Sequence, residues 1–152
     1  MRKIIILICI SLLINGCSII SSKEVAKVSF DNISTSSLID WKEVELDLIK
    51  EQKVFFWTKL DINYKNELQL EYKIQIICNS DTLGYISLNA LEKEITVGEL
   101  KSFIGNETNW SFTGYMNFFK IKRDGHYKFR ILLVSNLNNT LKLNKAIFIL
   151  KV

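Results

Sequence analysis

The sequence offers few side chains that could carry out catalysis. His126 is the only histidine among the 152 residues, and imidazole is the usual general acid or base near neutral pH. In a strand, His126 would point away from the apolar face that Tyr127 and Phe129 share, and therefore toward solvent. A zinc site would need a second imidazole or a pair of thiols, and the chain has no Gly-x-Ser-x-Gly elbow. We expect no catalytic or metal-binding role for His126.

Acidic side chains form one regularly spaced row. Glu43, Glu45 and Asp47 alternate with apolar residues, which would place the three carboxylates on one face of a strand. Paired carboxylates perform glycoside hydrolysis, so a hydrolase is one hypothesis. A row of like charges on an exposed strand also discourages edge-to-edge pairing, and this second interpretation requires no chemistry. No glycine-rich phosphate loop, calcium loop or dinucleotide fingerprint is present. We therefore expect neither a cofactor nor enzymatic activity.

The N-terminus has the organisation of an export signal. A short basic start, Met1–Lys3, precedes an apolar run that ends at Ile14. At about 1.5 Å per residue, a helix of that length covers about half of the ~30 Å hydrocarbon layer, which is typical of a signal peptide and not of a membrane span. The run continues into Ile14–Cys17, which resembles the lipobox of bacterial lipoproteins: a branched apolar residue, a tolerant position, a small residue and a cysteine.

The resemblance covers only the first 17 residues. It implies lipid transfer to the Cys17 thiol, cleavage after Gly16 and a palmitate-carrying protein anchored to the bilayer of the cell envelope. Ser18 is not the aspartate associated with inner-membrane retention, so the resemblance favours the outer membrane, facing the periplasm. The alternative is a chance cysteine behind an uncleaved signal. In the lipidated mature chain Cys78 is the remaining thiol, and we expect it to be buried and inert, with no disulfide.

Composition places the rest of the chain among globular domains. The net charge of +4 is too small to predict a nucleic-acid partner. With 48% hydrophobic and 11% aromatic residues, the chain is neither disordered nor fibrous. The length fits one domain. We divide the chain into a signal peptide over residues 1–16, a lipidated cysteine with a tether or N-terminal segment over 17–40, and a folded domain over 41–152.

Apolar and polar residues alternate with period 2 along most of that domain, which predicts strands. The strands are expected at Lys42–Ile49, Lys53–Tyr64, Glu67–Cys78, Leu83–Leu88, Asn109–Lys122, His126–Ser135 and Leu141–Lys151. An amphipathic helix over Leu38–Ile49 is the competing interpretation of the first. The least regular stretch, Ala90–Thr108, is expected to hold a short strand at Glu94–Val97 and a helical turn at Val97–Phe103.

Short polar links predict how these strands connect. Lys65-Asn66 favours a tight hairpin between the two longest alternating segments, Asn136–Asn139 favours a terminal hairpin, and Gly114 favours a bulge within its strand. Seven to eight closely spaced strands with little helix predict an all-β, antiparallel sandwich. Asp124–Phe129 resembles the tyrosine corner of immunoglobulin-like domains, with Gly125 two residues before a tyrosine, and this resemblance implies an Ig-like sandwich. A hairpin turn followed by an aromatic strand is the alternative.

Phe55 and Trp57 are the candidate binding patch. They lie on the second face of the Lys53–Tyr64 strand, whose first face is apolar. Exposed aromatics there could stack on a sugar ring or receive a partner protein. The interpretation we favour is that the Lys23–Trp41 segment covers them.

The function predicted from these observations is a lipid-anchored, non-catalytic binding or accessory subunit with an unidentified protein or glycan partner. A second hypothesis is an inhibitor or immunity-type lipoprotein that sequesters a toxin or an envelope enzyme, with a charged loop surface at Glu92–Glu107. An envelope hydrolase is the third.

Overall fold

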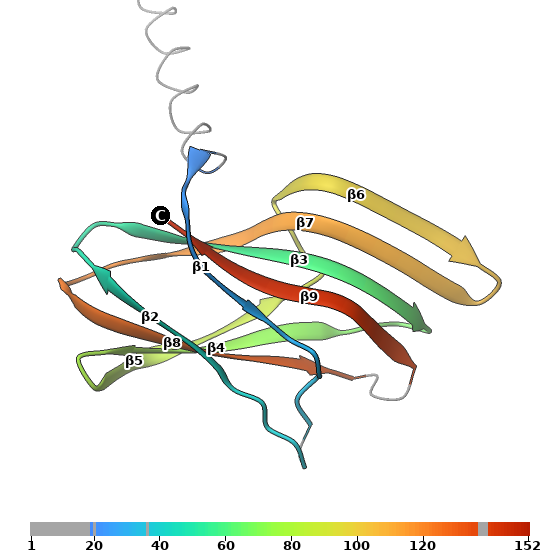
Figure 1. Cartoon of the computed structure of the whole chain (residues 1–152), viewed down its shortest axis with the longest axis horizontal. Helices are drawn as coiled ribbons and strands as arrows, with labels where there is room; N and C mark the ends of the chain where they lie inside the picture. Colours follow the sequence, from blue (N-terminus) through green and yellow to red (C-terminus); the bar gives the residue numbers. More distant parts are fainter. Residues whose placement is uncertain (1–18, 20, 36, 137–139) are drawn as a thin grey trace, which may run out of the picture.

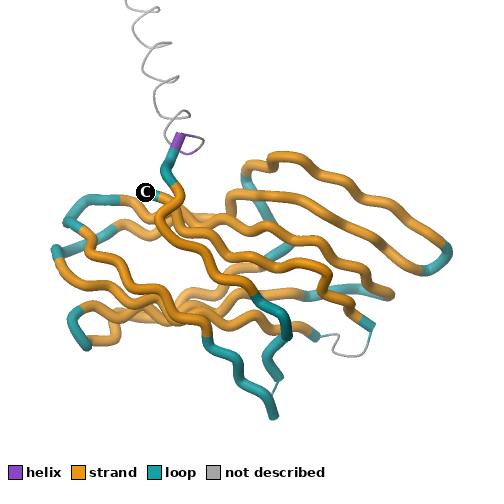
Figure 2. Tube along the Cα trace, in the orientation of Figure 1, coloured by secondary structure: helices purple, strands orange, loops and turns teal. Residues whose placement is uncertain are grey.

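The computed structural model describes residues 19, 21–35, 37–136 and 140–152. These residues form two antiparallel sheets packed face to face (Figures 1 and 2), so the predicted β-sandwich is confirmed. The predicted signal peptide and Cys17 lie outside the described residues. The nine strands of the described chain are β1 (Glu24–Ser29), β2 (Lys42–Leu48), β3 (Lys53–Lys65), β4 (Leu70–Cys78), β5 (Asp81–Asn89), β6 (Ile95–Ile104), β7 (Glu107–Lys120), β8 (Gly125–Ser135) and β9 (Leu141–Lys151).

The strand order interleaves early and late parts of the chain. Sheet A has the order β1-β9-β3-β7-β6, and sheet B has the order β2-β8-β4-β5. Most consecutive strands therefore change sheet, as they do in a jelly roll. An immunoglobulin domain instead keeps its last two strands, F and G, in one sheet, whereas β8 and β9 lie in different sheets.

Two of the predicted hairpins are consequently wrong. Lys65-Asn66 and the link from Ser135 to Leu141 each carry the chain from one sheet to the other. Alternation defines the buried face of a strand but does not name the partner that covers it. Strands β3 and β4 bury their apolar faces against each other across the core, and the hydroxyls of Thr58 and Tyr72 lie 2.9 Å apart there.

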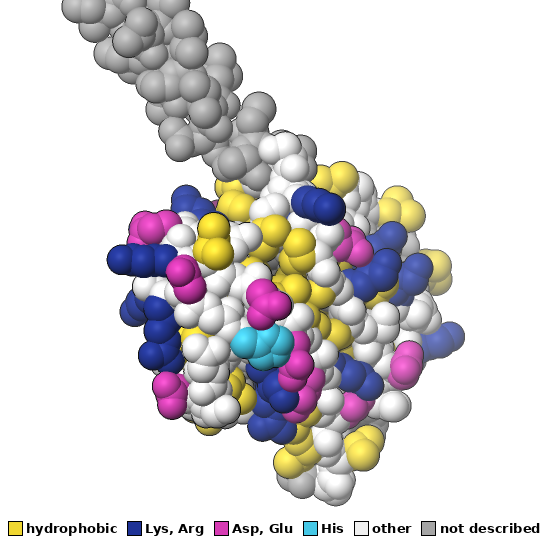
Figure 3. All heavy atoms as spheres, turned by 60° about the vertical axis from the view of Figure 1, so that its left-hand side comes forward, with side chains coloured by type: hydrophobic (Ala, Val, Ile, Leu, Met, Phe, Trp, Pro, Cys, Tyr) yellow, Lys and Arg dark blue, Asp and Glu magenta, His cyan; other side chains and the backbone are white. Residues whose placement is uncertain are grey.

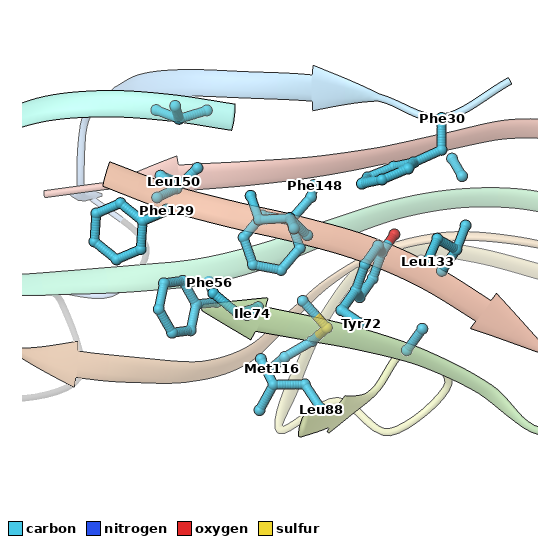
Figure 4. Packing of buried hydrophobic residues seen from close by; sticks show 14 of the residues in the cluster. Phe30, Phe56, Tyr72, Ile74, Leu88, Met116, Phe129, Leu133, Phe148 and Leu150 are labelled. Carbon is cyan, nitrogen blue, oxygen red and sulfur yellow. The ribbon is translucent and has the colours of Figure 1, made fainter. Parts of the chain in front are cut away.

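The core fills the space between the sheets (Figure 4). The Phe148 ring packs against Tyr72 and Phe56, with centroids 4.9 and 5.5 Å apart. The predicted alternation in β2, β3 and β4 is confirmed, since every second side chain of each strand packs in this core. The alternative of a helix over Leu38–Ile49 is wrong.

The folded domain begins before residue 41. Strand β1 pairs with β9 at the edge of sheet A, and Phe30 is buried in the core with its ring 5.8 Å from Tyr72. Further on, Ser34 forms a parallel bridge with Val134. Residues 24–34 therefore belong to the sandwich, because this segment satisfies its backbone at the sheet edge instead of serving as a tether.

Local geometry at one turn, one bulge and one glycine refines the sequence predictions. Tyr127 donates its hydroxyl to the Arg123 carbonyl at 2.8 Å, the hydrogen bond that defines a tyrosine corner. The bulge in β7 lies at Met116, because Phe56 pairs with Asn117 and Trp57 with Tyr115; the prediction of a bulge at Gly114 is wrong. Position 114 instead requires glycine for close packing, since a Cβ at Gly114 would lie 2.9 Å from the Cβ of Lys93.

Candidate functional site

The candidate patch, Phe55 and Trp57, is buried. The two side chains lie on the outer face of sheet A and are 7% and 2% exposed. They pack with Tyr115 and Ile149, and we call these four residues the outer aromatic cluster. The Tyr115 ring lies 6.1 Å from Phe55 and 5.8 Å from Trp57. In this state the two rings offer no open platform for a sugar.

The cover differs from the predicted one. Ile19, Ile95 and Ile147 pack against the outer aromatic cluster, and the Lys151 ammonium lies 4.2 Å from the Trp57 ring. Burial is confirmed, but the prediction that Lys23–Trp41 provides it is wrong. That segment forms β1 and the link to β2, because its backbone pairs with the β9 edge. Its side chains Leu38 and Ile39 remain exposed.

The indole N–H of Trp57 is an unpaired buried donor. No described residue accepts a hydrogen bond from it, and such a group carries a desolvation cost of about 1–3 kcal/mol. Replacing Trp57 by phenylalanine removes the donor but also some packing, so the two effects oppose each other. We expect Trp57→Phe to change the unfolding free energy by less than about 1 kcal/mol, measured by urea denaturation. A loss above about 3 kcal/mol would mean that the indole has an acceptor in solution.

The acidic row of β2 forms a charged ladder with β8 on the outer face of sheet B. Glu43, Glu45 and Asp47 pair in register with Arg130, Lys128 and His126. The Arg130 Nε donates to Glu43 at 2.8 Å, and the Lys128 ammonium lies 2.8 Å from Glu45. Each carboxylate thus faces a basic side chain of β8.

His126 lies between two of these carboxylates, and in Figure 3 the histidine appears in cyan among acidic side chains. Its Nδ1 is 2.8 Å from Asp47, and its Nε2 is 3.3 Å from Glu45. Hydrogen bonds to Asp47 and then to Glu45 raise the pKa of His126 above its ordinary value. Lys128 and His126 in turn lower the pKa of Glu45. The predicted exposure of His126 is confirmed.

The raised pKa of His126 predicts a pH dependence of stability. Because the folded state holds the proton more tightly than the unfolded chain, this contribution is fully present below the unfolded pKa and is lost as the pH rises through the folded pKa. We expect an NMR titration of His126 to give a midpoint above the ordinary value of 6.5. Asp47→Asn should lower that midpoint more than Glu45→Gln does, because Asp47 makes the larger contribution. If His126 titrated with the same midpoint in both variants and in the unmodified protein, this assignment would be contradicted.

The other predicted chemistry-bearing residue, Cys78, is fully buried as a free thiol. Its place on the apolar face of β4 is confirmed. Within the part of the chain that the structure describes, no group of three or more histidine, cysteine or acidic side chains could hold a metal ion. No helix among those residues is long and apolar enough to cross a membrane.

A projecting hairpin is the feature that sequence reasoning missed. Strands β6 and β7 extend beyond the body of the sandwich (Figure 1), and we call β6 with residues 105–113 the arm. Four large apolar side chains of β6 are exposed: Val97 at 55%, Leu100 at 72%, Phe103 at 71% and Ile104 at 69%. Val97, Leu100 and Ile104 share one face of β6, and Phe103 lies on the other; exposed apolar surface gathered on one element marks interaction sites in soluble proteins.

The two faces of the arm differ. Val97, Leu100 and Ile104 pair with residues on the outer face of β7 and form an apolar row there. On the other face Trp110 donates its indole N–H to Glu99 at 2.7 Å, and the Lys101 ammonium lies 3.9 Å from the Trp110 ring. These contacts hold β6 in position. Its far side has no strand neighbour among the described residues, which leaves a sheet edge available for pairing.

No family model, curated protein or solved structure matches this chain.

The sequence did contain a signal for the arm. Gly105-Asn106 is a two-residue hairpin turn of a common type, and Gly105 adopts a left-handed φ of 61°. The helical turn predicted at Val97–Phe103 is wrong, because the backbone there pairs with β7. Exposure of the apolar row could not be read from the pattern, since alternation normally indicates a buried face.

Proposed function

We propose that this protein is a lipid-anchored, non-catalytic binding subunit of the bacterial envelope. Cys17 would carry the anchor, and the arm would bind a partner protein. The exposed apolar row of the arm is the observation that supports binding. The order of a basic start, a short apolar run and a lipobox in the sequence supports the anchor.

The free edge of β6 favours a particular kind of partner. An extended segment of another protein could pair with this edge and continue sheet A, with backbone hydrogen bonds supplying affinity. Apolar side chains of the added strand would then lie beside Leu100 and Ile104, and an acidic or basic residue could pair with Lys101 or Glu99. The partner we propose is therefore a protein with an extended, alternating apolar segment.

An inhibitor or immunity-type lipoprotein is the second candidate. The region expected to carry its charged surface, Glu92–Glu107, coincides with the arm, although β6 exposes mainly apolar side chains. A projecting hairpin suits insertion into the cleft of a toxin or enzyme. Tight binding to one such protein, with loss of its activity, would distinguish this function from that of an accessory subunit.

The arm can be tested with substitutions that leave the fold intact. Leu100→Ser and Phe103→Ser change exposed side chains, so their melting temperatures should match that of the unmodified protein. We expect each to reduce recovery of the partner from detergent-solubilised membranes by about tenfold or more, since central apolar contacts dominate binding energy. Ile39→Ser, an equally exposed change outside the arm, is the matched control. Unchanged recovery with both arm variants would refute the arm as the binding surface.

A further inference from the structure

The outer face of sheet A carries positive charge that the fold leaves uncompensated. Five lysines on this face form no ion pair with a described carboxylate: Lys53 and Lys59 of β3, and Lys142, Lys145 and Lys151 of β9. Two acidic side chains are immediate strand neighbours of these lysines. Asp61 faces Lys145 and accepts a hydrogen bond from Asn144 at 3.1 Å, and Glu24 faces Lys151 but is ion-paired with Lys27. The ammonium groups of Lys53 and Lys151 lie over the rings of Phe118 and Trp57, at 4.8 and 4.2 Å, and none of the five charges is neutralised by a described carboxylate.

Sheet B shows the opposite arrangement. Its basic residues on β8 are paired in register with the carboxylates of β2. Lys73 of β4 is an exposed lysine of that face without an ion pair to a described residue. The two faces of the sandwich thus differ in charge: one is largely neutralised internally, and the other is basic.

The chain reaches the sandwich on the basic face. Ile19 packs against the outer aromatic cluster of sheet A. Cys17 precedes Ile19 by two residues, and two residues of extended chain span at most about 7 Å. Acyl chains on Cys17 would therefore emerge directly beside the outer face of sheet A.

We propose that the outer face of sheet A lies against a bilayer with anionic headgroups, while the charged ladder of sheet B points away from it. This inference rests on the proposed anchor at Cys17. Lysines near an anionic leaflet are attracted to its surface, and the five lysines lie on the side from which the anchor emerges. A hollow of about 350 Å³ on this face is lined by Lys59, Lys145, Asp61, Ser111 and Thr113, among others, and it offers room for a headgroup.

Membrane contact of this face leaves the edge of β6 open to a partner strand, whereas the apolar row of Val97, Leu100 and Ile104 lies on the same outer face and would also face the bilayer. A strand added to the edge of β6 would lie in the plane of sheet A, parallel to the bilayer. The partner would then approach along the membrane surface and would not need to displace lipid from the lysines.

The orientation can be tested with the full-length lipoprotein in vesicles. Thr113→Cys on sheet A and Ser87→Cys on sheet B introduce matched sites for a fluorescent label, because Cys78 is buried. Vesicles contain phosphatidylglycerol or only phosphatidylcholine, with a spin-labelled headgroup lipid as the quencher. With phosphatidylglycerol we expect quenching at Thr113→Cys to be several times that at Ser87→Cys. Equal quenching, or stronger quenching on sheet B, would overturn the proposed orientation.

Charge variants test the role of the lysines. In the Thr113→Cys background, Lys59→Gln with Lys145→Gln should remove most of the extra quenching that phosphatidylglycerol produces over phosphatidylcholine. Lys73→Gln, the matched change on sheet B, should leave it unchanged. An equal effect of both changes would overturn the role of this face. A protein that fails to float with vesicles of either composition would overturn the anchor at Cys17 and the orientation with it. A protein that floats, but whose labels at Thr113→Cys and Ser87→Cys are quenched equally, would overturn the orientation alone.

Discussion

A Cys17→Ser variant is expected to incorporate no labelled palmitate and to remain as the uncleaved precursor. The thiol is the atom that would accept the lipid, and serine offers no equivalent nucleophile to lipid transfer. The unmodified protein should be smaller by residues 1–16 and carry the label. Metabolic labelling followed by electrophoresis measures both properties together.

The two other cysteines supply matched controls for this prediction. Cys78 is a buried thiol of β4, and Cys9 lies within the expected signal peptide. Cys78→Ser and Cys9→Ser should both keep the label and the mature size. Palmitate on the Cys17→Ser variant, with normal processing, would rule out the lipobox interpretation.

Phe30→Ala is expected to lower the free energy of unfolding by about 3–5 kcal/mol, the usual effect of removing a buried phenyl ring. Phe30 is 3% exposed, its ring packs against Tyr72, and its backbone N–H donates to the Ala146 carbonyl at 2.9 Å. The substitution would leave a cavity between β1 and the core. Urea denaturation of the two proteins gives the difference.

Ile39→Ala is the control for Phe30→Ala. Ile39 belongs to the same N-terminal segment but is 63% exposed, so its truncation should change stability by less than about 0.5 kcal/mol. A loss below about 1 kcal/mol for Phe30→Ala would mean that the N-terminal segment does not pack in the core. Equal losses for the two variants would also contradict the assignment of residues 24–34 to the sandwich.

Several features follow from the sequence because they depend on local pattern. Period-2 alternation places Tyr72, Ile74 and Cys78 on one face of β4, and that face is buried. The same reasoning orients His126 toward solvent. Glycine two residues before Tyr127 indicated the tyrosine corner, whose hydrogen bond needs only a short stretch of chain.

Pairing partners could not be predicted in the same way. The link between β3 and β4 was predicted at Lys65-Asn66 and spans residues 66–69 in the structure. A short link of this kind permits a hairpin or a crossing to the opposite sheet, and both outcomes bury the same apolar face. The fold selects the crossing because β3 and β4 then cover each other. For the same reason the sequence could not identify what covers Trp57, since its neighbours Tyr115 and Ile149 come from strands distant along the chain.

The sequence by itself determined the class of fold and the buried faces of the main strands. Tertiary structure alone decided which charges meet. Asp47 faces His126 across two strands, whereas Lys59 and Lys145 form no ion pair with a described carboxylate, although Lys145 is paired in register with Asp61. It also decided that β6 ends sheet A and leaves Leu100 in solvent. The physical reason is that burial and charge pairing depend on strands far apart in sequence, whereas alternation is a property of each strand alone.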